Sequence, residues 1–105
     1  MSDRFRDIAS LDRLVHDPSR LAILTVLSAC READFTYLLN LTGLTKGNLS
    51  SHITKLEENK LLSVRKTYKL KKPVTFVKLT KQGRKAIDDH WEKLSLLKDN
   101  KNTLV

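Results

Sequence analysis

The chain has 105 residues, 40% of them hydrophobic, which suffices for one compact core and not for two ordinary domains, so we expect a single domain over residues 1–105. A net charge of +8 favours a polyanionic partner, either nucleic acid or anionic lipid. The single cysteine, Cys30, excludes an internal disulfide, and the longest apolar stretch, LAILTVLSAC, is about half of the roughly 20 residues that a membrane span needs.

Two helices are predicted at the start of the chain. Hydrophobic residues at helical spacing predict the first over residues 2–16. The sequence HDPSR then predicts the start of a second helix. Asp17 is a good N-cap, and Pro18 suits the first helical position, where its missing N–H costs nothing. The second helix, residues 18–30, is apolar on several sides, so we expect it to be the most buried one.

A pair of helices separated by a tight turn is predicted next. The first of the pair covers residues 35–41, with Thr36 as its N-cap, and Gly43 ends it in the left-handed conformation. The second begins two residues later, with Thr45 as its N-cap, and is expected to end at Asn59, again in a left-handed conformation. The sequence therefore predicts a helix-turn-helix.

The second helix of this pair has an unusual outer face. Leu49, Ile53 and Leu56 form one apolar stripe. A solvated face usually carries Lys, Glu and Arg, whereas Gly, Ser, Asn and Thr weaken a helix. The composition indicates contact with a partner; the alternative is a solvated surface that happens to be rich in Ser and Thr. The face opposite the stripe carries Gly47, Asn48, Ser50, Ser51, Thr54 and Lys55, and the candidate contact residues also include Thr45 and Lys46 at the start of the helix.

Beyond the helix pair the hydrophobic period changes to two. LLSVRKTY and PVTFVKL are separated by KLKK, which predicts a two-stranded hairpin with a basic tip and with Pro73 at the start of its second strand. Between Asn59 and Ile87 there are ten basic residues and no acidic one. These basic residues indicate a contact surface. The alternative is a surface that only keeps the protein soluble, but the absence of Asp and Glu from this segment argues against that alternative. The basic residues of the hairpin are Arg65, Lys66, Lys69, Lys71 and Lys72.

A last helix is predicted after Thr80, its N-cap. Its apolar stripe and that of the first helix lie at opposite ends of the chain, and one small domain cannot hide both. We therefore expect a homodimer that buries them, with Trp91 as the anchor, because large aromatic side chains dominate interfaces. The dimerisation residues would be Phe5, Ile8, Leu11, Val15, Ile87, Trp91, Leu94 and Leu97.

Over residues 11–94 the chain resembles the small prokaryotic MarR-like and ArsR-like winged-helix regulators. DPSRLAIL, FTYLLNLTGLTKGNLSSHITKLEENKLL, VKLT and KQGRKAI carry the resemblance by their order and spacing. It implies a mainly α fold with a small β hairpin (α+β), with about five helices and a two-stranded wing. It also implies a transcriptional regulator, by analogy a repressor, that binds double-stranded DNA. Residues 45–59 would be the recognition helix in the major groove, and residues 65–75 a wing on the backbone or minor groove.

Other functions find less support in the sequence. Asp88 and His90 resemble half of the metal pair on the last helix of ArsR-like sensors, but the other half is missing, so no metal or cofactor is expected. His16, His52 and His90 fall in different elements without a nucleophile or phosphate loop, so an enzyme is not expected. Cys30 is interpreted as an inert thiol.

The N-terminal MSDRFRD lacks the apolar core of a secretory signal, so we expect a cytoplasmic protein without a membrane partner. Nothing in the sequence indicates a small-molecule effector. The alternative to DNA binding is a winged-helix module that holds a protein partner, because many functions share one fold.

Overall fold

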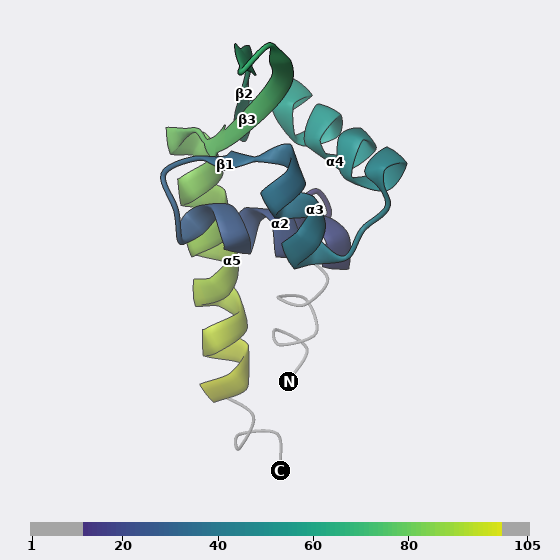
Figure 1. Ribbon diagram of the computed structural model, residues 1–105. Helices are drawn as coiled ribbons and strands as arrows, with labels where there is room; N and C mark the ends of the chain where they lie inside the picture. The colour runs from purple at the N-terminus through teal and green to yellow at the C-terminus, as the bar shows by residue number, and fades with distance from the viewer. Residues whose placement is uncertain (1–11, 100–105) are drawn as a thin grey trace.

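The computed structural model describes residues 12–99 and shows a winged helix (Figure 1). A helical body carries a β hairpin at one end, and the last helix extends from the body in the opposite direction. The elements are α2 (Pro18–Ser28), β1 (Ala33–Asp34), α3 (Phe35–Thr42), α4 (Lys46–Glu58), β2 (Leu62–Lys69), β3 (Lys72–Leu79) and α5 (Lys81–Asp99). The expected α+β class is confirmed, with four helices in the described residues instead of about five.

The first predicted helix lies mainly outside the described residues. Its last part, residues 12–16, forms a turn in which the N–H groups of Val15 and His16 donate to the Asp12 carbonyl at 3.1 and 2.7 Å. Phe5, Ile8 and Leu11 of the expected dimer surface also lie outside the described residues.

The central helix α2 begins as the sequence predicts. The Asp17 side chain accepts a hydrogen bond from the N–H of Arg20 at 3.0 Å, and Pro18 occupies the first turn. Ile23, Leu24 and Leu27 are fully buried, and α2 packs against α3, α4, α5 and β3. The expectation that this helix is the most enclosed one agrees with these contacts.

Helix α3 is capped by Asp34, so the expectation that Thr36 caps it is wrong. The Asp34 carboxylate accepts a hydrogen bond from the N–H of Tyr37 at 2.7 Å. The extended backbone that an N-cap requires also lets residues 33–34 pair with β3, opposite Val77 and Phe76. The sheet therefore has three antiparallel strands in the order β1-β3-β2, one more than the hairpin alone.

The ends of α3 and α4 differ in how well the sequence predicts them. Gly43 ends α3 with a φ of 70° and donates to the Leu39 carbonyl at 3.1 Å, as expected. The left-handed residue after α4 is Lys60, with a φ of 64°, and not Asn59, with a φ of −90°. Asn59 instead donates to the Lys55 carbonyl twice, from its backbone N–H at 3.2 Å and from its side-chain amide at 2.8 Å, which closes the last turn of the helix.

Helix α5 buries His90, a residue that the predicted apolar stripe does not include. His90 is 3% exposed, whereas Trp91 is 44% exposed. Ile87 and Val15 are fully buried in the core of their own chain, so neither side chain is available to a second copy, and the expectation that they form a dimer interface is wrong. Leu94 is half-buried.

The buried His90 lies against the turn before α2. Its Nε2 is 3.3 Å from Nδ1 of His16. Burial lowers the pKa of His90 below its ordinary value of 6.5, the nearby His16 and Lys93 lower it further, and Asp12 opposes them. The neutral imidazole is therefore the favoured form of His90 in the folded chain.

We expect the free energy of unfolding to decrease as the pH falls below about 6.5, since the unfolded chain then binds the proton that folded His90 resists. His90→Gln should flatten this part of the pH profile, measured as the thermal midpoint between neutral and mildly acidic buffers. An identical pH dependence in the wild type and the variant would contradict this assignment.

Candidate nucleic-acid interface

The two faces of α4 separate as the sequence predicts. Leu49 and Leu56 are fully buried and Ile53 is 6% exposed, so this stripe anchors α4 in the core. The opposite face is exposed and, apart from its lysines, consists of short polar side chains. The exposed residues of this face, including the N-cap, are Thr45, Lys46, Gly47, Asn48, Ser50, Ser51, Thr54 and Lys55.

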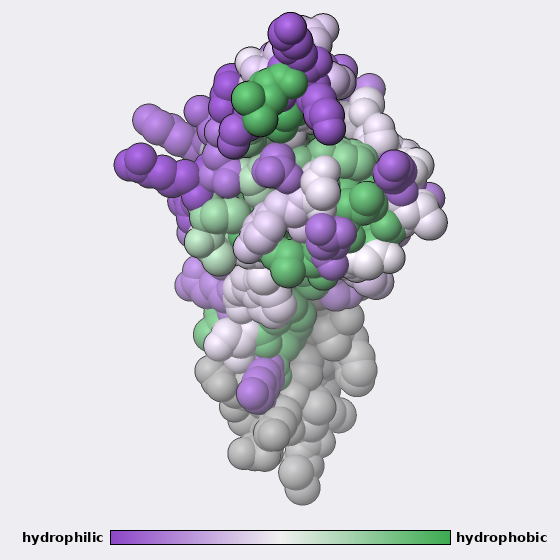
Figure 2. All heavy atoms as spheres, viewed as in Figure 1, coloured by the Kyte–Doolittle hydropathy of each residue, from purple (hydrophilic) through white to green (hydrophobic). Residues whose placement is uncertain are grey.

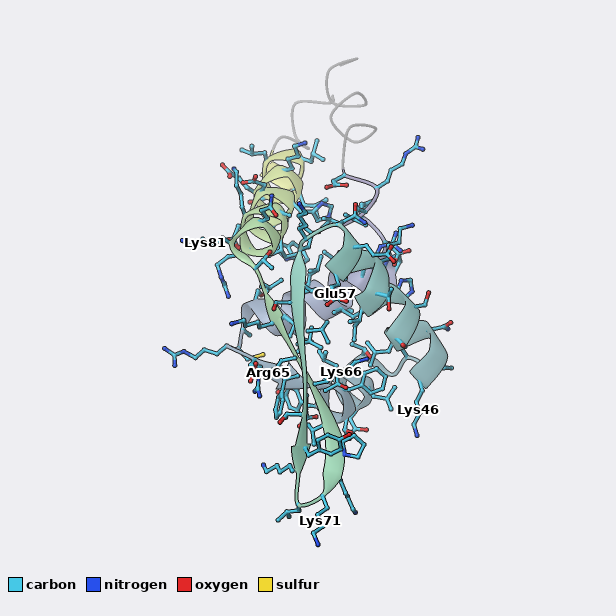
Figure 3. All side chains as sticks on the ribbon, turned by 90° about the horizontal axis from the view of Figure 1, so that it is seen from above. Lys46, Glu57, Arg65, Lys66, Lys71 and Lys81 are labelled. Carbon is cyan, nitrogen blue, oxygen red and sulfur yellow. The ribbon has the colours of Figure 1, made fainter. Side chains whose placement is uncertain are left out.

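The N-terminal end of α4 is suited to an anion. Thr45 Oγ1 accepts the N–H of Asn48 at 3.1 Å, which leaves the hydroxyl hydrogen of Thr45 free to donate outward. The first turn of α4 contains no acidic residue, and Lys46 projects from it in Figure 3. Glu57 and Glu58 are exposed at the other end of the helix. The helix dipole and the side chains thus both favour a negative partner at the N-terminal end.

The hairpin lies beside α4 when the molecule is seen from above (Figure 3). Strand alternation places Lys66 on the face that also carries Val64, which packs against the core, and Arg65 on the opposite face. Helix α4 packs against β2 next to this hairpin face. Lys66 therefore lies on the side of the hairpin next to α4, whereas Lys69 and its cross-strand partner Lys72 project from the face that carries Arg65.

Arg65 is held within the chain. Its Nη2 donates to Glu32 Oε1 at 2.8 Å, and its guanidinium lies 4.5 Å from the centre of the Phe76 ring. From the sequence, Arg65 was expected among the DNA-contacting residues; in the structure it links the hairpin to the segment before β1. The cause is β1 itself, because its pairing with β3 brings Glu32 to this face.

The tip of the hairpin carries the exposed basic residues. Strands β2 and β3 pair from Leu62 opposite Leu79 to Lys69 opposite Lys72, and the two residues between them form the turn. Pro73 is the second residue of β3, one position later than expected. Four consecutive exposed residues make up the tip, Lys69, Leu70, Lys71 and Lys72, which we call the wing tip.

The acid-free part of the sequence does not form a single face. Lys81 lies at the start of α5, away from α4 in Figure 3. Arg84 donates to the Ser28 carbonyl at 3.4 Å, and Lys85 pairs with Asp89 at 3.1 Å. The positive charge beside α4 therefore comes from the hairpin and from α4 itself.

A family model described as a winged helix DNA-binding domain matches residues 19–97. The chain belongs to this family. The resemblance to small winged-helix regulators is thereby confirmed. An uncharacterised protein of Methanocaldococcus jannaschii is 35% identical over 81 residues, 76% of this chain and 88% of that protein.

Solved structures agree with this membership. A transcriptional regulator homologue from Pyrococcus horikoshii OT3 superposes with a TM-score of 0.84 and 30% identity, over 93% of this chain and 96% of that one. The transcriptional repressor CouR, bound to a 23-mer DNA duplex, gives a TM-score of 0.73 over 98% of this chain and 70% of its own. Its identity of 17% shows a shared fold alone.

One contact of this winged helix domain was not predicted from the sequence. Arg20 Nη1 lies 3.3 Å from Nδ1 of His52 on α4, and Arg20 Nε donates to the Leu14 carbonyl at 2.7 Å. Its Nη2 is also 3.8 Å from Asp17 Oδ2. Arg20 thus fixes α4 to the turn before α2. The spacing of Asp17 and Arg20 is visible in the sequence, but the approach of His52, 32 residues away, is not.

The part of the winged helix domain between residues 12 and 99 contains a cavity of about 590 Å³ along α5. In the same residues, no group of three or more His, Cys, Asp or Glu side chains could hold a metal ion. None of the helices described there is long and apolar enough to cross a membrane. The cavity is lined by Asp12, Gln82, Lys85, Ala86, Asp89, His90, Glu92, Lys93 and Leu96.

Proposed function

We propose that the protein is a homodimeric, sequence-specific DNA-binding regulator, with α4 in the major groove and the hairpin on the neighbouring backbone or minor groove. The observation that carries the proposal is the exposed face of α4, made of short polar side chains and lying beside a basic hairpin (Figure 3). Membership of the winged helix DNA-binding family supports it.

The chemistry of α4 suits a DNA groove better than water. Short side chains at Gly47, Ser50 and Ser51 let the helix backbone approach base edges and phosphates closely, where hydroxyl groups can donate or accept hydrogen bonds. Lys55 adds positive charge to this face, and Lys46 adds it at the N-terminal end of the helix. Contacts to phosphates would fix the register of the helix, and contacts to base edges would read the sequence.

The distal part of α5 is the surface we assign to the dimer. Trp91 is 44% and Leu96 is 55% exposed, and Leu94 and Leu97 are half-buried on the same helix. In Figure 1 this end of α5 extends beyond the other described elements. Burying these side chains against a second copy would remove an apolar surface from water and would set two α4 helices about 34 Å apart on an inverted repeat.

Repression is the mode of regulation that we propose. Where its site overlaps a promoter, a dimer seated on two successive major grooves would block access of RNA polymerase, so repression needs no second domain. The shared fold with a repressor that was solved on DNA supports the geometry of such a complex. Expression of a reporter from a promoter that contains the bound sequence would test the direction of regulation.

Substitution of the outer face of α4 tests whether this helix reads sequence. Replacing Ser51, Thr54 and Lys55 together by Ala should reduce discrimination between a selected duplex and random DNA, since each specific base contact contributes about 1–3 kcal/mol. Fluorescence anisotropy with both duplexes at one salt concentration measures the ratio of the affinity for the selected duplex to the affinity for random DNA.

The control lies on the same helix. Glu57→Ala with Glu58→Ala changes exposed acidic residues in the last turn of α4. It should strengthen binding to both duplexes by removing negative charge and leave the ratio unchanged. If the triple variant also keeps the wild-type ratio, α4 is not the reading element, and a protein partner becomes the better explanation of its surface.

A further inference from the structure

The wing tip is built from residues that its geometry disfavours. Leu70 and Lys71 have φ angles of 53° and 64°, as in two-residue hairpin turns that normally contain Asn and Gly. A side chain with a Cβ is strained in this conformation. Lys69 and Lys72 are paired directly across the hairpin, where like charges repel each other. Folding stability therefore does not explain this sequence.

Leu70 is also exposed to an unusual degree. At 91% it is the most exposed large hydrophobic residue of the described part of the chain. Figure 2 shows hydrophobic surface at the top of the molecule, over the hairpin, between hydrophilic side chains. A single exposed leucine is ordinary on a protein surface, but a strained turn between lysines is not an ordinary place for one. Strain that persists in a structure often marks a functional site.

We propose that Leu70 is a wedge that enters the minor groove of duplex DNA and partly unstacks one base step, which kinks the duplex. The proposal rests on the proposed function, because it requires the hairpin to lie on DNA. Leucine is among the apolar side chains that act as such wedges, with kinks of about 20–90°. The minor groove is about 6 Å wide, so it admits a side chain at a turn without admitting the whole hairpin.

The charges around Leu70 select duplex DNA as the partner. The wing tip contains three lysines and no acid, and Lys69 and Lys72 project from one face of the hairpin. A minor groove is bordered by two phosphate backbones, so the lysines of the two strands that flank the turn can meet negative charge when Leu70 enters the groove. The left-handed backbone at Leu70 and Lys71 makes this a tight two-residue turn, which keeps the leucine at the apex.

Three substitutions of Leu70 separate a wedge from general electrostatic attraction. Leu70→Asn removes the apolar side chain and relieves strain, because Asn tolerates the left-handed conformation. Its thermal midpoint should equal or exceed that of the wild type, while binding to a selected duplex weakens about tenfold and the kink disappears. Leu70→Lys adds a positive charge and should also lose the kink. Leu70→Met keeps an apolar wedge and should retain it.

Two measurements on duplexes recovered by selection report the kink. Energy transfer between dyes at the duplex ends measures bending, and a fluorescent adenine analogue placed at successive positions reports an unstacked step. Bending and unstacking by the wild type and Leu70→Met, but not by Leu70→Asn or Leu70→Lys, is the expected result. Equal bending by all four proteins would overturn the proposal.

The remaining outcomes distinguish this proposal from the one it rests on. A wild-type protein that binds duplexes without bending them overturns the wedge and leaves the proposed function standing. A wild-type protein that binds no duplex overturns both. If Leu70→Asn weakens binding to phosphatidylserine vesicles and leaves DNA binding unchanged, the wing tip is a lipid-binding loop and the wedge is wrong.

Discussion

Replacing Gly83 by Ala is expected to destabilise the protein by about 3 kcal/mol or more. A Cβ at Gly83 would overlap the carbonyl oxygen of Leu61 and would come within 3.1 Å of Leu79 Cδ2. The carbonyl cannot easily move, because it accepts the N–H of Thr80 at 3.1 Å and belongs to the residue that precedes β2. Thermal unfolding should show a midpoint lowered by more than about 10 °C.

Gly47→Ala is the matched control for this substitution. Gly47 lies in α4 with nothing within 4 Å of its added Cβ, so alanine should stabilise the helix by about 0.5–1 kcal/mol. Opposite signs are expected at the two glycines, because both changes gain the helix propensity of alanine and only the Cβ at Gly83 meets a neighbouring atom. Equal midpoints for the wild type and Gly83→Ala would mean that α5 does not approach residue 61 so closely. The same Gly47 variant should bind DNA less well if α4 requires close approach to the groove.

Removing the three lysines of the wing tip should weaken binding to all DNA alike. The slope of log affinity against log salt should fall by ~1 unit for each phosphate that the protein no longer binds, so Lys69→Ala, Lys71→Ala and Lys72→Ala together should reduce affinity by roughly a hundredfold at low salt. The ratio between selected and random duplexes should stay near the wild-type value, because phosphate contacts carry no sequence information. Anisotropy titrations over a series of salt concentrations measure both quantities.

Three exposed lysines of α5 provide a control with the same change in net charge. Lys81, Lys85 and Lys98 lie on α5, outside the hairpin and α4. Their replacement by Ala should leave the salt slope close to the wild-type value. If both triple variants reduce the slope of log affinity against log salt equally, binding depends on the total charge of the protein. The hairpin then makes no specific contact with the DNA backbone.

Much of the fold could be predicted because its signals are local. Asp17 with Pro18, Thr45 and Thr80 each cap the helix that the sequence assigns to them. The apolar stripe of α4 and the period-two strands required no knowledge of distant residues. The exposed face of α4 and the alternation of the hairpin strands therefore follow directly from helical and strand geometry.

The missed features depend on contacts between distant parts of the chain. Strand β1 has only two residues and exists because β3 lies beside it. The contact of Arg65 with Glu32 was not predicted, because the two residues are 33 positions apart in the sequence. Helical spacing from Ile87 reaches both His90 and Trp91, and the burial of His90 was not predicted because its side chain is polar. His90 is tolerated in the core because it stays neutral beside His16.

The central claim is that a dimer of this chain reads DNA through two copies of α4 beside two basic hairpins. Selection of duplexes from a random pool by the wild-type protein, followed by sequencing and by anisotropy with the full site and a single half-site, tests it most directly. We predict an inverted repeat whose half-sites lie about one helical turn apart, bound far more tightly than either half alone. Recovery of no shared sequence, or equal affinity for a half-site and the full repeat, would contradict it.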